Sequence, residues 1–186
     1  MKHFYYAAIA VLLITTTAKA QNQDPWTEYM TPSSVHTLLK QYEGSFKMDI
    51  SMYMEDGKEP TIITVNSKHI MLLGGRFLEL KQQGNMMGMD YESIITLGFN
   101  NTDKKFALTT ITNMGTGTLS LSGNWNDKSK SATLFGTLTN PVSKNSITVR
   151  QVVTFVDNDT ILIENYDREG DNPEKKTVQY KLSRIK

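Results

Sequence analysis

The chain has 186 residues, no cysteine, a hydrophobic fraction of 39% and a formal net charge of +1. This length is enough for one domain with a substantial core, and the composition is not that of a disordered chain. The missing cysteine excludes disulfides, thiolate nucleophiles, zinc sites built on thiolates and a lipid anchor on an N-terminal cysteine. The near-neutral charge gives no indication of a nucleic-acid partner.

The first twenty residues have the pattern of a cleaved signal peptide. Lys2 and His3 precede an almost wholly apolar run from Phe4 to Ile14, and Ala18-Lys19-Ala20 has the small-x-small form of a signal peptidase site. The run is too short to span a bilayer as a helix; the alternatives are a buried N-terminal helix and a short membrane anchor. We therefore expect an exported protein, periplasmic or extracellular, and not an integral membrane protein.

Cleavage after Ala20 changes the charge. Lys2 and Lys19 leave, so the 20 basic residues become 18 against 19 acidic ones and the net charge becomes −1. Nothing in the mature chain attracts polyanions. The expected organisation is a signal peptide over residues 1–20, a polar leader over 21–31 and one β-barrel domain over 32–186.

A short helix is predicted at the start of the domain. Pro32-Ser33-Ser34 is a plausible helix start, and the helix is expected to run to about Tyr42. Apolar residues share one face of this segment at a spacing of three to four: Val35, Leu38, Leu39 and Tyr42. So short a helix is not stable alone, so this face must pack on the rest of the domain.

From Gly44 onward the hydrophobic period changes from 3.6 to two, which indicates strands. The first strand runs from Gly44 to Met54, with Phe46, Met48 and Ile50 on one face. Turn residues such as Gly74-Gly75 and Gln83-Gly84-Asn85 separate the segments that follow. The nine further strands are expected at Thr61–Leu73, Arg76–Gln82, Met89–Phe99, Lys105–Thr112, Gly117–Trp125, Ser131–Leu138, Ile147–Val156, Thr160–Asp167 and Lys176–Arg184.

The connections indicate how these strands assemble. No helix-length segment lies between them, so consecutive strands are antiparallel hairpins. Closing the sheet into an all-β, up-and-down barrel of about ten strands hides its two edges, and the helix then caps one end. A sandwich is the alternative, disfavoured because long crossovers are missing. A ten-stranded barrel has an interior somewhat wider than side chains alone fill.

Six motifs in chain order resemble those of a known bacterial family. They are Pro32-Ser33-Ser34-Val35-His36 with Leu38-Leu39, Tyr42-Glu43-Gly44-Ser45-Phe46, Leu73-Gly74-Gly75-Arg76-Phe77-Leu78, Gly88-Met89-Asp90-Tyr91-Glu92, Leu97-Gly98-Phe99-Asn100 and Asn113-Met114-Gly115-Thr116-Gly117. From about Pro32 to Lys186 the chain resembles the domain-of-unknown-function family fifteen seventy-nine. The resemblance implies a lipocalin-like (calycin-type) barrel and no settled activity.

The chain also departs from the family's pattern. Phe46 stands where the family usually has tryptophan, and Phe99 and Asn100 stand where it has tyrosine and aspartate. Thr110 and Thr112 occupy positions where tryptophan and aspartate are expected. If the missing groups line a family pocket, the ligand of this protein differs.

Polar residues on the apolar faces of strands are the candidate ligand-binding residues, because burying them without a partner is costly. Arg76 shares a face with leucines and can clamp a carboxylate with two hydrogen bonds. The others are Ser67, His69, Gln151 and Asn165. Each could instead lie at a barrel mouth or bond a neighbour; for Arg76 the alternative partner is Asp90 or Glu92.

The methionines are the unusual feature of the composition. Met52-x-Met54 and Met86-Met87-x-Met89 have spacings that thioethers could use for Cu(I), but gap-filling packing or a deformable ligand pocket is the favoured interpretation. We include Met52, Met89 and Tyr91 among the candidate ligand-binding residues.

Other chemistry is poorly supported. Asp90 and Glu92 share a strand face about 7 Å apart and could act on a glycoside, but a solvated outer face is the simpler interpretation. Only His36 and His69 survive cleavage, which excludes a three-histidine metal site, and no motif supports haem binding by His69. We expect no enzyme activity and no cofactor.

Two function classes remain. The first is a binding module that holds a small apolar or amphipathic molecule inside the barrel. The second is a cell-envelope interaction or structural protein whose barrel is filled and whose mouth loops contact another protein. The volume and lining of the interior distinguish them.

Overall fold

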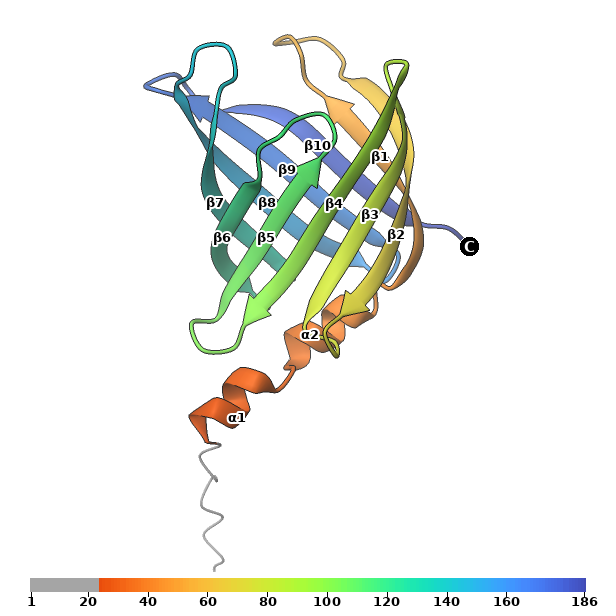
Figure 1. The fold of residues 1–186 in the computed structure, drawn as a ribbon, viewed down its shortest axis with the longest axis vertical. Helices are drawn as coiled ribbons and strands as arrows, with labels where there is room; N and C mark the ends of the chain where they lie inside the picture. Colours follow the sequence, from red (N-terminus) through yellow and green to blue (C-terminus); the bar gives the residue numbers. More distant parts are fainter. Residues whose placement is uncertain (1–23) are drawn as a thin grey trace, which may run out of the picture.

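The computed structural model describes residues 24–186, which form a closed barrel of ten antiparallel strands with two short helices at one end (Figure 1). Consecutive strands pair, and β1 pairs with both β2 and β10, which closes the sheet. The predicted up-and-down barrel is confirmed. The strands are β1 (Gly44–Met52), β2 (Thr61–Leu72), β3 (Phe77–Met86), β4 (Met89–Asn100), β5 (Lys105–Thr112), β6 (Leu119–Asn126), β7 (Ser131–Thr139), β8 (Ser146–Asp157), β9 (Thr160–Glu169) and β10 (Lys175–Arg184).

The predicted capping helix is α2 (Ser34–Lys40), and it lies at the end of the barrel opposite the long loops. Its Leu39 is fully buried, as expected for a helix stabilised by packing. The backbone N–H of Ser33 donates to Nδ1 of His36 at 2.9 Å, which satisfies one of the free donors at the helix start.

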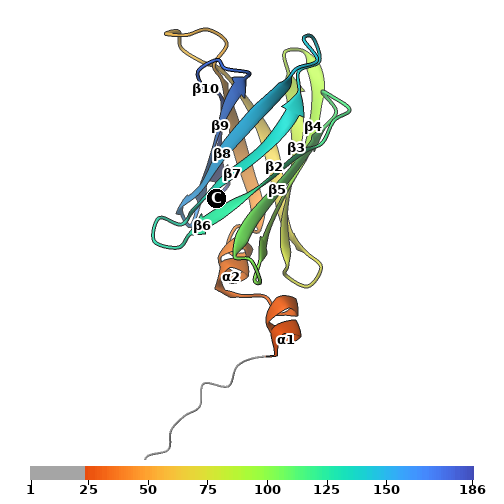
Figure 2. The ribbon, with the colours of Figure 1, turned by 90° about the vertical axis from the view of Figure 1, so that its left-hand side faces the viewer.

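A second helix, α1 (Pro25–Met30), was not predicted. It lies within the expected polar leader, and none of its residues is buried. Asp24 accepts a hydrogen bond from the backbone N–H of Thr27 at 3.1 Å, and proline occupies the first helical turn. Figure 2 shows both helices at the same end of the barrel. The predicted signal peptide, residues 1–20, lies outside the described residues, and within residues 24–186 no helix is long and apolar enough to cross a membrane.

One predicted turn is wrong. Gln83-Gly84-Asn85 lies inside β3, and the chain reverses at Met87 and Gly88 instead, with φ of 52° and 87°. This position of the strand needs a glycine, because a Cβ there would lie 2.6 Å from Cγ1 of Val65 on β2. The glycine therefore allows two neighbouring strands to approach, which its sequence context cannot distinguish from a turn.

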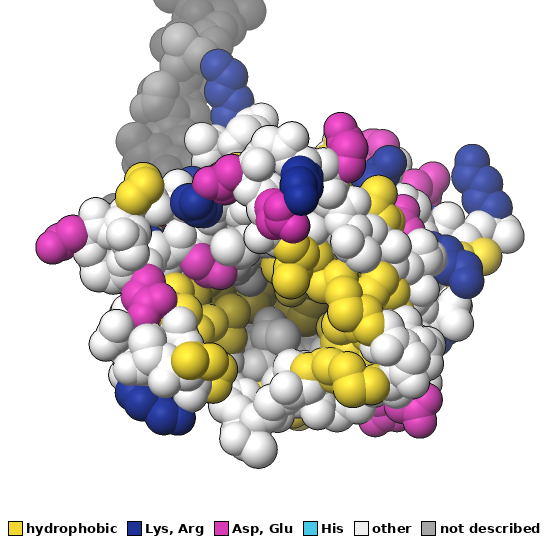
Figure 3. Space-filling view, turned by 90° about the horizontal axis from the view of Figure 1, so that it is seen from above, with side chains coloured by type: hydrophobic (Ala, Val, Ile, Leu, Met, Phe, Trp, Pro, Cys, Tyr) yellow, Lys and Arg dark blue, Asp and Glu magenta, His cyan; other side chains and the backbone are white. Residues whose placement is uncertain are grey.

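The two ends of the barrel interior differ. At the helix end aromatic rings fill it: Phe106 lies 5.6 Å from Trp125 and 6.1 Å from Phe155, and Tyr42 lies 5.0 Å from Phe155, between ring centroids. At the opposite end, the mouth, the molecule is hollowed and the hollow is lined largely by hydrophobic side chains (Figure 3). The mouth half of the interior therefore has room for a ligand.

Candidate functional site

An interior cavity of about 150 Å³ lies in the mouth half of the barrel. Leu119, the first residue of β6, and Leu138, next to the last of β7, place it close to the mouth. Its wall is mostly apolar, with a few hydroxyl and amide groups, which is the usual lining of a small-molecule site. The lining residues are Tyr91, Ile95, Thr110, Leu119, Leu138, Gln151, Ile163, Asn165 and Tyr180.

A hydrogen-bonded chain of side chains crosses β8, β9 and β10 on one side of the cavity. Nε2 of Gln151 donates to Oδ1 of Asn165 at 2.9 Å. Nδ2 of Asn165 donates to Oδ1 of Asp167 at 2.8 Å and to Oγ1 of Thr177 at 2.9 Å. The Thr177 hydroxyl donates to the other carboxylate oxygen of Asp167 at 2.7 Å. Asp167 thus anchors the amides that face the cavity.

Oε1 of Gln151 has no hydrogen-bond partner in the described part of the chain. The Gln151 side chain is only 4% exposed, and it belongs to the cavity wall. A buried acceptor without a donor is costly and is rare in folded proteins. Gln151 therefore brings an unsatisfied acceptor to the cavity wall.

A second hydrogen-bonded chain crosses β4, β3 and β2 on another side of the interior. The Tyr91 hydroxyl donates to Oγ of Ser93 at 2.9 Å, and Ser93 donates to Oε1 of Gln82 at 2.5 Å. Nε2 of Gln82 donates to Oγ of Ser67 at 3.2 Å. Gln82, Ser67 and Ser93 are all buried, and this chain satisfies the polar groups that they bring into the core.

His69 joins this chain to the helix end of the barrel. Its Nε2 lies 2.9 Å from Oγ of Ser67, and its Nδ1 lies 3.0 Å from the carbonyl oxygen of Tyr42. Burial lowers the pKa of the imidazole to about 4, so the ring is neutral at neutral pH. Both nitrogens are used within the protein, so the described residues give no support to His69 as a haem ligand.

Tyr180 adds a hydroxyl to the cavity wall. Burial, with Tyr91 and Asp167 nearby, raises the pKa of this hydroxyl well above its usual value. The group therefore keeps its proton and can either donate or accept a hydrogen bond.

The structure brings three of the predicted site residues together in the cavity wall: Tyr91, Gln151 and Asn165. Ser67 and His69 lie in the interior but within the second chain of hydrogen bonds. Of the two methionines, Met52 is half-buried against the core, whereas Met89 is 52% exposed at the mouth.

Arg76 does not reach the interior, contrary to the expectation that it would anchor a ligand there. It precedes β3, at the helix end, and its guanidinium donates to the carbonyl oxygens of Leu73 and Met30. The side chain lines a groove of about 370 Å³ outside the barrel, next to α1. Neither Asp90 nor Glu92, the alternative partners, pairs with it.

Gln82, and not Arg76, is the polar residue that β3 brings into the interior. The two residues have the same parity, but the strand begins at Phe77, so only Gln82 is carried inward. Tyr180 and Thr110 were also missed, although each shares a strand face with apolar residues: Thr110 with Phe106 and Leu108, and Tyr180 with Val178 and Leu182. That alternation could have identified them as interior hydroxyls.

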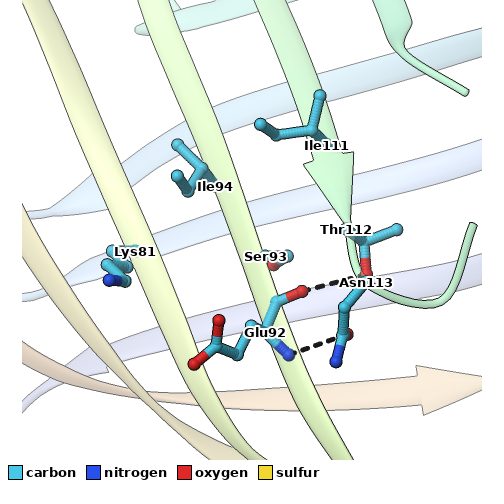
Figure 4. A pocket seen from close by; sticks show the side chains of 7 residues that line it. All are labelled: Lys81, Glu92, Ser93, Ile94, Ile111, Thr112 and Asn113. Atoms are coloured by element: carbon cyan, nitrogen blue, oxygen red, sulfur yellow. Dashed lines mark hydrogen bonds between the residues drawn. The ribbon is translucent and has the colours of Figure 1, made fainter. Parts of the chain in front are cut away.

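Asp90 and Glu92 have the solvated environment that was the simpler interpretation. Asp90 and Glu92 lie on the exposed outer face of β4, where Gln83 donates to Glu92 at 3.1 Å. Glu92 borders a shallow outer depression, and its backbone bonds Thr112 and Asn113 (Figure 4). Within residues 24–186 no group of three or more His, Asp or Glu side chains could hold a metal ion.

A ten-stranded up-and-down barrel, capped by a helix at one end and hollow at the other, has a lipocalin-like architecture. The chain belongs to the family described as "Protein of unknown function (DUF1579)", which matches residues 31–184. The predicted family is thereby confirmed. No curated protein matches the chain. Family membership agrees with the fold and assigns no activity.

Proposed function

We propose that this protein is exported and binds a small, mostly apolar molecule in the mouth-end cavity, without catalysing a reaction. The observation that supports the proposal most directly is the unpartnered Oε1 of Gln151, a residue in the wall of a mostly apolar cavity. The hydrogen-bonded chains behind Gln151 and Tyr91 hold these groups in fixed orientations, as a binding site requires.

The size of the cavity limits the ligand. A volume of about 150 Å³ is comparable with that of cavities that accept a single aromatic ring. An amphipathic molecule with a longer chain would therefore place only one end in the cavity and extend through the mouth.

A cavity-filling substitution tests the proposal. The Leu138 side chain lines the cavity, whereas that of its neighbour Thr137 is exposed. We expect Leu138→Phe to fold and to lose the ligand that native mass spectrometry detects on protein purified from its own host. Thr137→Phe adds the same ring outside the barrel and should keep that ligand. A wild-type protein without a co-purifying molecule, and without a thermal shift across a panel of small apolar metabolites, would refute the proposal.

The mouth also supports a second candidate function, contact with another envelope protein. Four methionines of the mouth loops and strand ends are exposed: Met54 (74%), Met87 (62%), Met89 (52%) and Met114 (43%). Exposed apolar side chains around one opening are typical of an interaction surface. Cross-linking in the native host should then capture one fixed partner, and capture should fail for Met87→Gln/Met89→Gln.

Copper binding by methionine is a minor candidate. Met86 and Met89 face each other across the β3–β4 hairpin, and Met87 lies in its turn. Calorimetry with Cu(I) on the wild type and on Met86→Leu/Met87→Leu/Met89→Leu tests this. Equal affinities would remove the candidate.

Export depends on residues outside the described part of the chain. Edman sequencing of the protein recovered from the periplasm or medium should begin at Gln21. Recovery of the intact N-terminus from the cytoplasm would contradict export.

A further inference from the structure

The direction of the hydrogen bonds on the β8–β10 side is determined by Asp167. A carboxylate oxygen only accepts, so Nδ2 of Asn165 must face it as the donor. Oδ1 of Asn165 then faces Gln151 and must receive the N–H of its Nε2. The remaining atom of the Gln151 amide is Oε1, a buried acceptor without a partner on a side chain that belongs to the cavity wall. Flipping either amide would place two acceptors or two donors against each other.

The direction on the β2–β4 side is determined by the Tyr42 carbonyl in the same way. That oxygen accepts from Nδ1 of His69, so Nε2 of the neutral ring accepts from the Ser67 hydroxyl. Oγ of Ser67 consequently accepts from Nε2 of Gln82, whose Oε1 accepts from Ser93.

The last bond of this chain occupies the proton of Tyr91. Ser93 has given its own proton to Gln82, so the Tyr91 hydroxyl must donate to Ser93. Only the lone pairs of the Tyr91 oxygen remain for a bound molecule. Two separate chains of hydrogen bonds, anchored at opposite sides, therefore both end in acceptors at the cavity wall.

We propose that the cavity selects a neutral molecule that places one ring inside, any further ring extending toward the mouth, and that carries an N–H or O–H donor on the enclosed ring, and that Oε1 of Gln151 accepts this hydrogen. The inference rests on the proposed binding function and narrows it to a class of ligand. The hydroxyls of Thr110 and Tyr180 do not discriminate, because a hydroxyl can rotate to donate or accept. Oε1 of Gln151 cannot change its role, so a ligand without a donor leaves it buried and unpaired.

Neutrality follows from the lining. Ile95, Leu119, Leu138 and Ile163 form the apolar part of the wall, and no charged side chain is among the lining residues of this cavity. Burying an unpaired charge there would cost far more than one hydrogen bond returns. Alcohols, phenols, amides and indole-type N–H groups fit these requirements, and ammonium ions do not.

Three bicyclic probes of similar size test the inference in the mature wild-type protein. Indole offers a donor, benzofuran an acceptor and indene neither. Affinities come from chemical-shift titrations of the backbone amides. We expect indole to bind about tenfold more tightly than either of the other two, the ratio that one satisfied buried hydrogen bond gives.

Two variants assign the effect to one atom. Gln151→Met removes the acceptor and keeps the length of the side chain, and it should reduce the advantage of indole to about twofold or less. Thr110→Val, the matched control, removes a different polar group from the same wall and should keep the advantage. If Gln151→Met does not fold, the ratio of the indole and benzofuran affinities in the wild type still tests whether the cavity requires a donor.

The outcomes separate this inference from the proposed function. Equal binding of all three probes, or an indole preference that survives in folded Gln151→Met, overturns the donor requirement and leaves small-molecule binding intact. Binding of none of the three at millimolar concentration, with unchanged amide shifts at Ile95 and Ile163, overturns the binding function itself.

Discussion

The imidazole of His69 lies parallel to the ring of Phe46, with 4.1 Å between the ring centroids and 9° between the ring planes. The guanidinium carbon of Arg184 lies 4.6 Å from the centroid of the same Phe46 ring. His69 is 1% exposed, and both of its nitrogens are hydrogen-bonded inside the barrel. The buried ring must therefore be neutral for the interior chain of hydrogen bonds to form.

This relationship predicts a loss of stability in mild acid. The pKa of His69 falls from 6.5 to about 4 on folding, so the unfolded chain takes up a proton first as the pH falls. The free energy of unfolding should decrease as the pH drops below about 7, by about 1 kcal/mol between pH 7 and pH 5.5. Urea unfolding at the two pH values measures the change.

A variant separates His69 from other titrating groups. His69→Gln is less stable at pH 7 but should lose about 1 kcal/mol less of its remaining stability over the same interval. The pKa of His36 is also lowered, chiefly by burial, so a small dependence should persist. The same pH dependence in His69→Gln and the wild type would contradict the assignment.

Gln82 should contribute strongly to stability. It is fully buried and bonds Ser67 and Ser93, so Gln82→Met removes one partner from each of two buried hydroxyls and leaves the proton of Ser93 without an acceptor. We expect a cost of about 2 kcal/mol or more in the free energy of unfolding. Gln83→Met, on the exposed face of the same strand, should change it by less than about 0.5 kcal/mol. Similar costs for both variants would contradict the role of the interior chain.

Gly136 should not tolerate a side chain. A Cβ at this position of β7 would lie 2.3 Å from the carbonyl oxygen of Ser120 on β6 and 2.6 Å from a methyl group of Leu121. Because the obstacle includes backbone, we expect Gly136→Ala to destabilise the barrel by about 2 kcal/mol or more. Gly115→Ala is the control, since nothing lies within 4 Å of its Cβ position. Thermal unfolding of both variants checks this; an unchanged melting temperature for Gly136→Ala would be the contrary result.

Arg184 should hold the helix end of the barrel together. Its guanidinium donates to Oδ1 of Asp159 at 2.8 Å and to the carbonyl oxygen of Glu43 at 2.7 Å, and it also bonds the Gln41 carbonyl. A lysine cannot make these bonds at once, so Arg184→Lys should cost about 1–3 kcal/mol. The exposed Arg168→Lys is the control and should be nearly neutral. Chemical denaturation gives the free energy of unfolding of both variants. A loss for Arg184→Lys alone would show that the hydrogen bonds of Arg184, and not its charge, stabilise the barrel.

The alternation of apolar and polar residues was enough to predict the barrel. Successive side chains of a strand point to opposite faces, so Phe46, Met48 and Ile50 predicted both a strand and its buried face. The missing long connections then made sequential hairpins the simplest topology. The same reasoning placed Gln151 and Asn165 on the interior face, where the structure has them.

Local sequence patterns gave wrong predictions at two kinds of position: at the end of a strand, and where two neighbouring strands lie unusually close together. Arg76 and Gln82 have the same parity, and nothing in the local sequence shows that β3 starts after the first and includes the second. Gly84 resembles a turn residue, and only the proximity of Val65 on the next strand explains it. The start of a strand and the distance to the next strand both depend on residues elsewhere in the sheet, so one segment of the sequence does not specify them.

By itself, the sequence determined the strand count, the face of each strand and four of the polar residues that enter the core (Ser67, His69, Gln151 and Asn165), because all three follow from the period-two pattern. Only the tertiary structure decided that aromatic rings fill the helix end, that about 150 Å³ remains open near the mouth, and that Gln151 brings an unpartnered acceptor to the wall of this space. The reason is that seven strands, β4 to β10, contribute the cavity wall, and the orientation of the Gln151 amide depends on Asp167 and Thr177, which it does not contact directly. A volume and a hydrogen-bond direction belong to an assembled set of strands, and no single stretch of the chain specifies either.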